Sequence, residues 1–134
     1  MKLDKLHGDD RGEIYLLTGF KEYPEVTMFT TKEGYARGGC IHNVHDEYCC
    51  VLEGEIEYHL IDNSGDDMFG HASFKLKVGQ TITIPKGTPH YFLSKTDSVV
   101  LEWGATPEEK KEKHQFMRKI VDDINGKKLA SDML

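Results

Sequence analysis

Short runs in which apolar and polar residues alternate are the feature that most constrains the fold of this chain. The segment EIEYHL (55–60) puts three apolar side chains on one face of an extended backbone and three polar side chains on the other. The segments FKLKV (74–78) and TITI (81–84) alternate in the same way. Because successive side chains of a strand point to opposite faces of a sheet, these runs predict half-buried strands of an antiparallel sheet.

Turn-forming segments separate the predicted strands, at 53–55, 62–67, 78–80, 85–89 and 95–98. Many short strands joined by frequent turns are typical of a sandwich or a small barrel. The chain has 134 residues, a length that fits one domain. We therefore expect one all-β domain with an antiparallel barrel over about residues 12–103.

The C-terminal part carries helix signals instead. Thr106 can cap a helix, Pro107 suits the first helical position, and Glu109 completes a capping box. Apolar residues then recur at helical spacing, at Phe116, Met117, Ile120, Val121 and Ile124. This pattern predicts an amphipathic helix over about residues 107–125.

Gly126 is well placed to end this helix, so residues 127–134 are expected to form a mobile tail. The apolar face of the helix could pack on the outside of its own barrel or lie across a dimer interface. The sequence leaves both arrangements open. Exposed edge strands give a physical reason to expect a homodimer.

The charge and composition exclude some classes of partner. A formal net charge of −6 argues against nucleic acid or an anionic membrane as the partner, since both require a basic face. No apolar run reaches the length of a membrane span, and the N-terminus has no apolar signal core. Three cysteines, two of them adjacent, make a poor disulfide framework. We expect a soluble cytoplasmic protein with reduced thiols.

The segment GYARGGCIHNVHDEYCCVLEG (34–54) concentrates residue types that bind metals. Cys40 and His42 are two positions apart and would share one face of a strand, while Glu47 begins the next strand. His42 and His45 are three positions apart and would face opposite sides. A thiolate, an imidazole and a carboxylate are all competent ligands for first-row metals. Alternatively, the cysteines are small buried apolar residues and His42 is a polar core residue.

The spacing of five residues in this segment resembles the first motif of the cupin family, G-x5-H-x-H-x(3,4)-E-x6-G. The matching positions are Gly34, Cys40, His42, Glu47 and Gly54. The departure is Cys40, which stands where the family has its first histidine.

A later segment, GQTITIPKGTPHYF (79–92), is similar to the second cupin motif, G-x5-P-x-G-x2-H-x3-N. The matching residues are Gly79, Pro85, Gly87 and His90, and Ser94 replaces the final asparagine. The resemblance implies a small jelly-roll barrel with a metal ion inside it.

In the family, the corresponding positions supply four ligands, which map here to Cys40, His42, Glu47 and His90. A ligating thiolate would shift the preference toward zinc, iron or nickel. If Cys40 does not coordinate the ion, two histidines and one carboxylate remain as ligands, a set typical of iron oxygenases.

Further residues are candidates for the chemistry around such a metal. Glu102 lies in an apolar strand, where an unpaired carboxylate is costly, so Glu102 and Tyr48 are candidates for moving a proton. The candidates for binding substrate are Arg37, Phe92 and Tyr58. The guanidinium of Arg37 could bind a carboxylate or phosphate group of the substrate. Each has a plainer alternative: a surface ion pair for Arg37, an outward orientation for Glu102, and core packing for the aromatic residues.

Three functions from different classes fit these features. The favoured one is a metal-dependent enzyme acting on a small polar metabolite such as a sugar or keto acid, with isomerase-like or epimerase-like Lewis-acid chemistry. The second is a non-haem iron dioxygenase. The third is a non-catalytic module that binds a small molecule.

Overall fold

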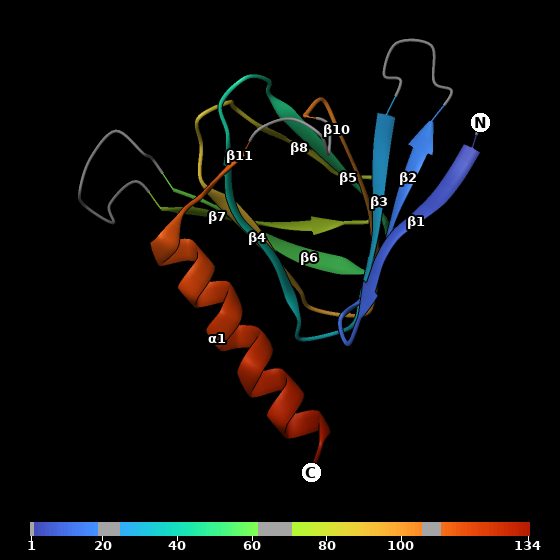
Figure 1. The fold of residues 1–134 in the computed structure, drawn as a ribbon, viewed down its shortest axis with the longest axis vertical. Helices are drawn as coiled ribbons and strands as arrows, with labels where there is room; N and C mark the ends of the chain where they lie inside the picture. Colours follow the sequence, from blue (N-terminus) through green and yellow to red (C-terminus); the bar gives the residue numbers. More distant parts are fainter. Residues whose placement is uncertain (1, 19–24, 62–70, 106–110) are drawn as a thin grey trace.

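The computed structural model describes residues 2–18, 25–61, 71–105 and 111–134. These residues form eleven strands and one C-terminal helix (Figure 1). In chain order they are β1 Lys2–Asp9, β2 Gly12–Thr18, β3 Glu25–Thr31, β4 Ala36–His42, β5 Glu47–Glu53, β6 Glu55–Leu60, β7 Ala72–Lys77, β8 Thr81–Ile84, β9 His90–Ser94, β10 Ser98–Trp103, β11 Lys111–Lys113 and α1 Gln115–Asp132.

The strands form two antiparallel sheets that enclose one apolar core (Figure 1). One sheet has the order β1-β2-β3-β10-β5-β8 and the other β11-β4-β9-β6-β7. The core cluster consists of Cys49, Val51, Ile56, Tyr58, Leu76, Ile84, Phe92 and Val100. The predicted all-β fold, a small antiparallel jelly-roll barrel with a C-terminal helix, is confirmed.

The alternating patterns of the sequence account for this core. Ile56 and Tyr58 of β6 are 0% and 1% exposed, and Ile84 of β8 is 2% exposed. Gly54 turns the chain sharply between β5 and β6, with a φ of 79°. A Cβ atom at Gly54 would lie 2.2 Å from the carbonyl oxygen of Asp97, so only glycine fits this turn.

The helix is displaced from its predicted position. It runs from Gln115 to Asp132, with His114 as its N-cap, and passes through Gly126. The prediction that the helix ends at Gly126 is therefore wrong, and the segment expected to be a mobile tail is largely helical. An ion pair at i,i+4 between Lys128 Nζ and Asp132 Oδ1 (2.9 Å) supports the last turn.

The start of the helix also differs. The predicted capping residues Thr106, Pro107 and Glu109 lie outside the described residues, so that cap is not tested. Residues Lys111–Lys113, expected to be helical, form strand β11 and pair with β4. Backbone hydrogen bonds to the edge of β4 override the local helix signal at these positions.

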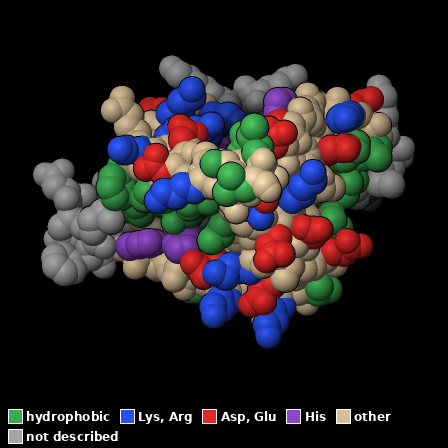
Figure 2. All heavy atoms as spheres, turned by 90° about the horizontal axis from the view of Figure 1, so that it is seen from below, with side chains coloured by type: hydrophobic (Ala, Val, Ile, Leu, Met, Phe, Trp, Pro, Cys, Tyr) green, Lys and Arg blue, Asp and Glu red, His purple; other side chains and the backbone are tan. Residues whose placement is uncertain are grey.

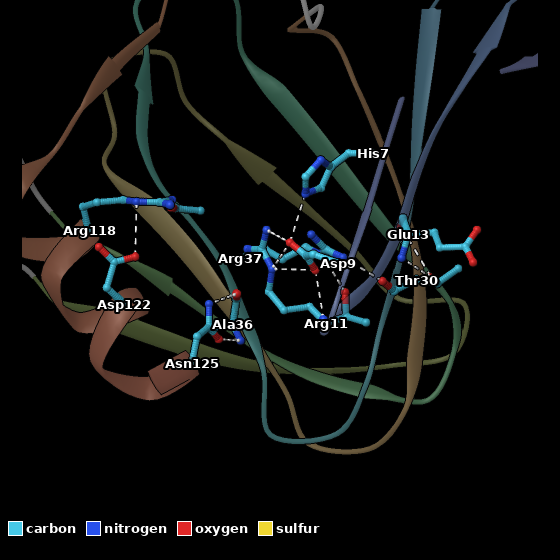
Figure 3. A network of polar contacts seen from close by, with 12 residues as sticks. His7, Asp9, Arg11, Glu13, Thr30, Ala36, Arg37, Arg118, Asp122 and Asn125 are labelled. Atoms are coloured by element: carbon cyan, nitrogen blue, oxygen red, sulfur yellow. Dashed lines mark hydrogen bonds and ion pairs between the residues drawn. The ribbon is translucent and has the colours of Figure 1, made fainter. Parts of the chain in front are cut away.

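The helix packs on the outer face of the five-stranded sheet. Met117 and Val121 are fully buried against Ala36 and Tyr91. Asn125 fixes the position along the strand, because its Oδ1 accepts from Ala36 N (2.7 Å) and its Nδ2 donates to Ala36 O (3.0 Å) (Figure 3). The helix therefore covers its own barrel, one of the two arrangements that the sequence left open.

The six-stranded sheet carries apolar side chains on its outer face, among them Met28, Tyr48, Leu101 and Trp103. The expected homodimer stays a prediction. Within the described parts of the chain, no helix combines the length and the apolar character needed to span a bilayer.

Candidate metal centre and its cavity

Three of the predicted ligands come together where the two sheets face each other. His42 ends β4 and His90 begins β9, and these two strands are hydrogen-bonded neighbours in the five-stranded sheet. Glu47 begins β5 in the opposite, six-stranded sheet. The group therefore bridges the barrel, which requires the barrel to close.

The geometry of this group is compact. One ligand atom from each of His42, Glu47 and His90 lies within 4.8 Å of the others. His42 Nε2 is 3.3 Å from Glu47 Oε2, and His90 Nε2 is 3.1 Å from Glu47 Oε1. The two imidazole rings are stacked, with centroids 5.5 Å apart. Each donor atom thus converges on one point from a different strand.

The backbone orients His90 for this role. Its Nδ1 lies 2.9 Å from the carbonyl oxygen of Thr88, and since a carbonyl can only accept, Nδ1 carries the hydrogen. This leaves Nε2 directed at Glu47, an arrangement common in histidines that bind metals. Burial disfavours the imidazolium of His90, but the adjacent carboxylate of Glu47 outweighs this effect and raises the pKa of His90.

The donor set fits a divalent transition metal. Glu47 is 4% exposed, and its Oε1 makes no hydrogen bond of good geometry with any described residue. A buried carboxylate oxygen without a donor is costly unless a cation compensates it. Two imidazoles and one carboxylate are the ligands that zinc, iron and nickel accept.

Cys40 is not part of this compact group. It lines the same cavity and is only partly buried, but its sulfur is outside the set of atoms that lie within 4.8 Å of one another. A register shift between Gly38 and Cys40, where β4 pairs with β9, alters the strand just before it. The predicted four-ligand set is therefore found as three residues, with the cysteine to one side.

A cavity of about 210 Å³ opens at the candidate metal centre and contains Glu102 in its wall. Glu102 accepts a hydrogen bond from the Tyr58 hydroxyl (3.0 Å). Burial, and then the nearby charge of Glu47, raise the pKa of Glu102 to about 8. The inward orientation of Glu102 follows from its pairing opposite Thr27 of β3 and Cys49 of β5.

The other predicted site residues divide clearly. Phe92 and Tyr58 both line the cavity, with ring centroids 5.7 Å apart. Tyr48 lies on the opposite face of β5 from Glu47 and stacks on Trp103, 5.8 Å between ring centroids. Because neighbouring residues of a strand face opposite sides, the structure does not bring Tyr48 to the site.

Arg37 also lines the cavity and is 4% exposed. Its Nε donates to Thr31 Oγ1 (2.8 Å), its Nη2 donates to the Thr30 carbonyl (2.9 Å), and its guanidinium lies over the Phe29 ring. Burial lowers the pKa of Arg37 to about 10, so the side chain remains charged at neutral pH. The alternative of a surface ion pair does not hold.

Sequence reasoning missed three basic residues that line the same cavity. They are Arg11 from the turn between β1 and β2, Lys111 of β11, and Arg118 of α1. The available signal was the scarcity of arginine, since the chain has only Arg11, Arg37 and Arg118. Nothing in the sequence places the three together.

A second cavity of about 200 Å³ adjoins the first at the candidate metal centre. The residues that the two cavities share in their walls are Ile14, Phe29, His42, Glu47, Glu102 and Lys111. Beyond these shared residues, the second cavity is lined by less polar side chains, including Leu6 and Ala105. The centre therefore lies between a basic space and a more apolar one.

Comparison with known proteins gives a family and a fold. The family described as "Cupin domain" matches residues 28–104. A search of curated proteins found no match.

Three solved structures illustrate the fold. The capsular polysaccharide assembling protein CapF from Staphylococcus aureus superposes with a TM-score of 0.69 at 18% identity over 84% of this chain and 32% of CapF. The S161A mutant of Bacillus subtilis oxalate decarboxylase OxdC gives 0.67 at 16% identity over 82% of this chain and 29% of OxdC. KdgF from Halomonas sp. gives 0.61 at 18% identity over 78% of this chain and 88% of KdgF. This chain thus spans only about a third of CapF or OxdC.

Proposed function

The chain belongs to the cupin family, and we propose that it is a metal-dependent enzyme acting on a small polar metabolite of the sugar or keto-acid type. The observation that carries the proposal is the convergence of His42, Glu47 and His90 beside a cavity that also contains Glu102. A ligand set alone would suit a structural ion. A titratable carboxyl in the wall of the same cavity is what an acid–base reaction needs in addition.

The residues divide the work as follows. His42, Glu47 and His90 would hold the ion, which supplies Lewis-acid polarisation of a carbonyl or hydroxyl when bound. Glu102 would take a proton from the carbon next to the carbonyl, and the electron pair of the broken C–H bond would move toward the carbonyl oxygen. Return of the proton to the former carbonyl carbon, with transfer of the hydroxyl proton from one oxygen to the other, would complete an isomerisation. Return of a proton to the opposite face of the same carbon, with the electron pair moving back from the oxygen, would complete an epimerisation.

The surroundings of Glu102 support this role. The Tyr58 hydroxyl holds one carboxyl oxygen in place at 3.0 Å. Burial raises the pKa of Tyr58 well above its ordinary value, so that this hydroxyl stays protonated and donates. Burial raises the pKa of Glu102 to about 8 in the metal-free protein, and a cation held beside it would lower this pKa toward neutral pH, where a carboxyl takes and returns a proton with little energetic bias.

The experiment is deuterium incorporation in heavy water. The zinc-loaded and nickel-loaded proteins are incubated with a panel of small keto sugars and 2-oxo acids, and exchange at the carbon next to the carbonyl is followed by NMR. We expect exchange with wild type and at least about 100-fold slower exchange with Glu102→Gln, the usual scale for a general acid–base group. Metal binding without exchange of any panel member above the rate of free metal would contradict the proposal.

A second candidate function is favoured by one observation. Two histidines and one carboxylate, with Cys40 to one side, form the set typical of non-haem iron oxygenases. The iron(II)-loaded protein would then consume oxygen in the presence of substrate, and the zinc-loaded protein would not. Oxygen uptake measured on the same metabolite panel separates the two candidates.

A further inference from the structure

The distribution of arginine sets the cavity apart from the rest of the molecule. The chain has 17 basic and 23 acidic residues. On the surface shown in Figure 2, the two kinds are interspersed. Yet all three arginines of the chain line the first cavity, and the other charged residues of the described chain that line it are Lys111, Glu47 and Glu102.

The three arginines reach the cavity from separate parts of the fold. Arg11 comes from the turn after β1, Arg37 from the middle of β4, and Arg118 from α1. Figure 3 shows Arg11 and Arg37 beside each other, with Arg118 reaching in from the helix. Arg118 Nη1 donates to the carbonyl oxygen of Gly38, the residue after Arg37, which anchors the third guanidinium to strand β4 at the cavity.

Two of the three charges are already matched. Arg11 makes a short ion pair with Asp9, 2.6 Å between Nη2 and Oδ2. Arg118 Nε lies 3.5 Å from Asp122 Oδ1. These two contacts orient the arginines but reduce the charge that each presents to the cavity.

Arg37 differs from both. It is almost fully buried, and it makes no ion pair with any described residue, although Asp9 and Glu102 are close enough to favour its charge. Its hydrogen bonds to described residues use Nε and Nη2 and leave Nη1 uncommitted. A buried guanidinium without a bonded anion is costly, and its planar fork matches the oxygens of a carboxylate or phosphate.

We propose that the cavity binds a small metabolite through an anionic group, a carboxylate or a phosphate monoester, held by Arg37 with Arg11 and Arg118 beside it. The rest of the ligand extends past the candidate metal centre toward Leu6 and Ala105 in the adjoining cavity. This inference rests on the proposed function for the reaction at the centre, but it names the class of molecule that reaches it. The volumes of the two spaces, about 210 and 200 Å³, suit a small metabolite rather than a polymer.

The test is calorimetric titration of the full-length zinc-loaded protein with three probes: 2-oxopentanoate, butyl phosphate and the neutral ketone pentan-2-one. We expect at least one anion to bind and the ketone to bind much more weakly. The difference between the two anions tells carboxylate from phosphate. Binding of the ketone as tightly as both anions, or no binding of either anion up to about 10 mM, would overturn the proposal.

The variants locate the binding group. Arg37→Met keeps an unbranched apolar stem and removes the guanidinium with its charge, and we expect the affinity for the preferred anion to fall at least about tenfold. Arg118→Met should cause a smaller, severalfold loss, since its charge is half-exposed and screened. Lys119→Met, on the exposed face of the same helix, is the matched control and should change nothing. Unchanged affinity in both arginine variants would overturn the proposal.

Two further measurements, circular dichroism and zinc content, separate a loss of anion binding from a loss of the fold or of the metal. If Arg37→Met does not fold, judged by circular dichroism, Arg118→Met still carries the test, because that side chain is 38% exposed and its loss is tolerated more easily. Zinc content measured on the same samples separates this proposal from the proposed function. Anion binding by a wild-type protein that takes up no zinc would contradict the metal enzyme and support the anion site.

Discussion

The two halves of the cavity differ in how the chain builds them. The metal half takes His42, Glu47 and His90 from the ends of strands, where a fixed hydrogen-bonded register sets the distances. The basic half takes Arg11 from a turn, Arg118 from the helix, and Arg37 and Lys111 from strands β4 and β11. Short ligand distances need a rigid frame, whereas long side chains with flexible stems can converge from scattered elements. The metal half can therefore be recognised by sequence spacing, and the basic half only in three dimensions.

Removal of a metal ligand gives the largest expected effect. His90→Ala deletes one of three converging donors, and the metal affinity should fall by more than the roughly 10–100-fold lost with an outer-shell partner. Elemental analysis after dialysis against a defined zinc buffer should show about one ion per chain in wild type and almost none in the variant.

The matched control is His45→Ala, which removes an exposed histidine three positions from His42. We expect this variant to keep its zinc. Equal metal loss in both variants would mean that the ion is held somewhere other than the group of His42, Glu47 and His90.

The basic half should depend on the docking of the helix. Met117 belongs to α1, precedes Arg118 in sequence, and is fully buried between the helix and the five-stranded sheet. Met117→Ala should lower the free energy of unfolding by about 2–5 kcal/mol, through lost burial and the cavity left behind. Urea unfolding followed by fluorescence of Trp103, the single tryptophan, measures this loss.

Lys119→Ala serves as its control, because Lys119 is exposed on the same helix and should change stability by less than about 0.5 kcal/mol. If folded Met117→Ala protein binds zinc normally and anions weakly, the basic half depends on the docking of the helix and the metal half does not. Normal anion binding by that variant would show that the position of Arg118 does not depend on this contact.

The sequence predicted the fold more completely than the site. Alternation of apolar residues located the strands, and the spacing of two glycine-containing motifs identified the residues that converge. The helix bounds were wrong because local signals at Gly126 and Lys111–Lys113 were overridden by contacts with β4 and by pairs in the last turn. Capping rules describe an isolated helix, and this one is fixed by packing.

Individual site residues also differ in whether the sequence alone could have placed them. Tyr48 could have been excluded from the site by the alternation of side chains along a strand, since it directly follows Glu47 in β5 and so faces the opposite side. Glu102 could not be assigned to the inner or the outer face from alternation alone, because only the position of β10 between β3 and β5 shows which face of the strand lies inside the barrel. Arg11 and Arg118 could not be found at all, because their convergence depends on how a turn and a helix pack on the barrel.

The pH dependence of stability should report on Glu102, the group where the two halves meet. Its pKa is raised from 4.5 to about 8, so the folded protein holds a proton that the unfolded chain releases. The stabilising contribution is complete below about pH 4.5 and is lost as the pH rises toward 8. In chelator-treated protein, the slope due to Glu102 should approach about −1.4 kcal/mol per pH unit at most.

Glu102→Gln removes this contribution, whereas most of the contribution of His90, whose raised pKa acts in the same direction and depends on Glu102 only in small part, remains in both proteins. Urea unfolding between about pH 5 and 8 provides the measurement. Added zinc should flatten the wild-type curve, because a nearby cation favours the ionised carboxylate. Parallel curves for wild type and Glu102→Gln without metal would contradict the buried, proton-holding carboxyl.

The smallest effect is expected at Cys40, and it tests the boundary of the metal half. The sulfur lines the cavity but lies outside the converging donors, so Cys40→Ala should keep one metal ion per chain, with an affinity change of less than about tenfold. Cobalt(II) makes the distinction spectroscopic, because a coordinated thiolate produces a sulfur-to-cobalt charge-transfer band in the near ultraviolet. We expect the cobalt-loaded wild type to lack this band and to match Cys40→Ala. A band present in wild type and absent from the variant would place the thiolate on the ion, and the metal half would then have four ligands from this chain instead of three.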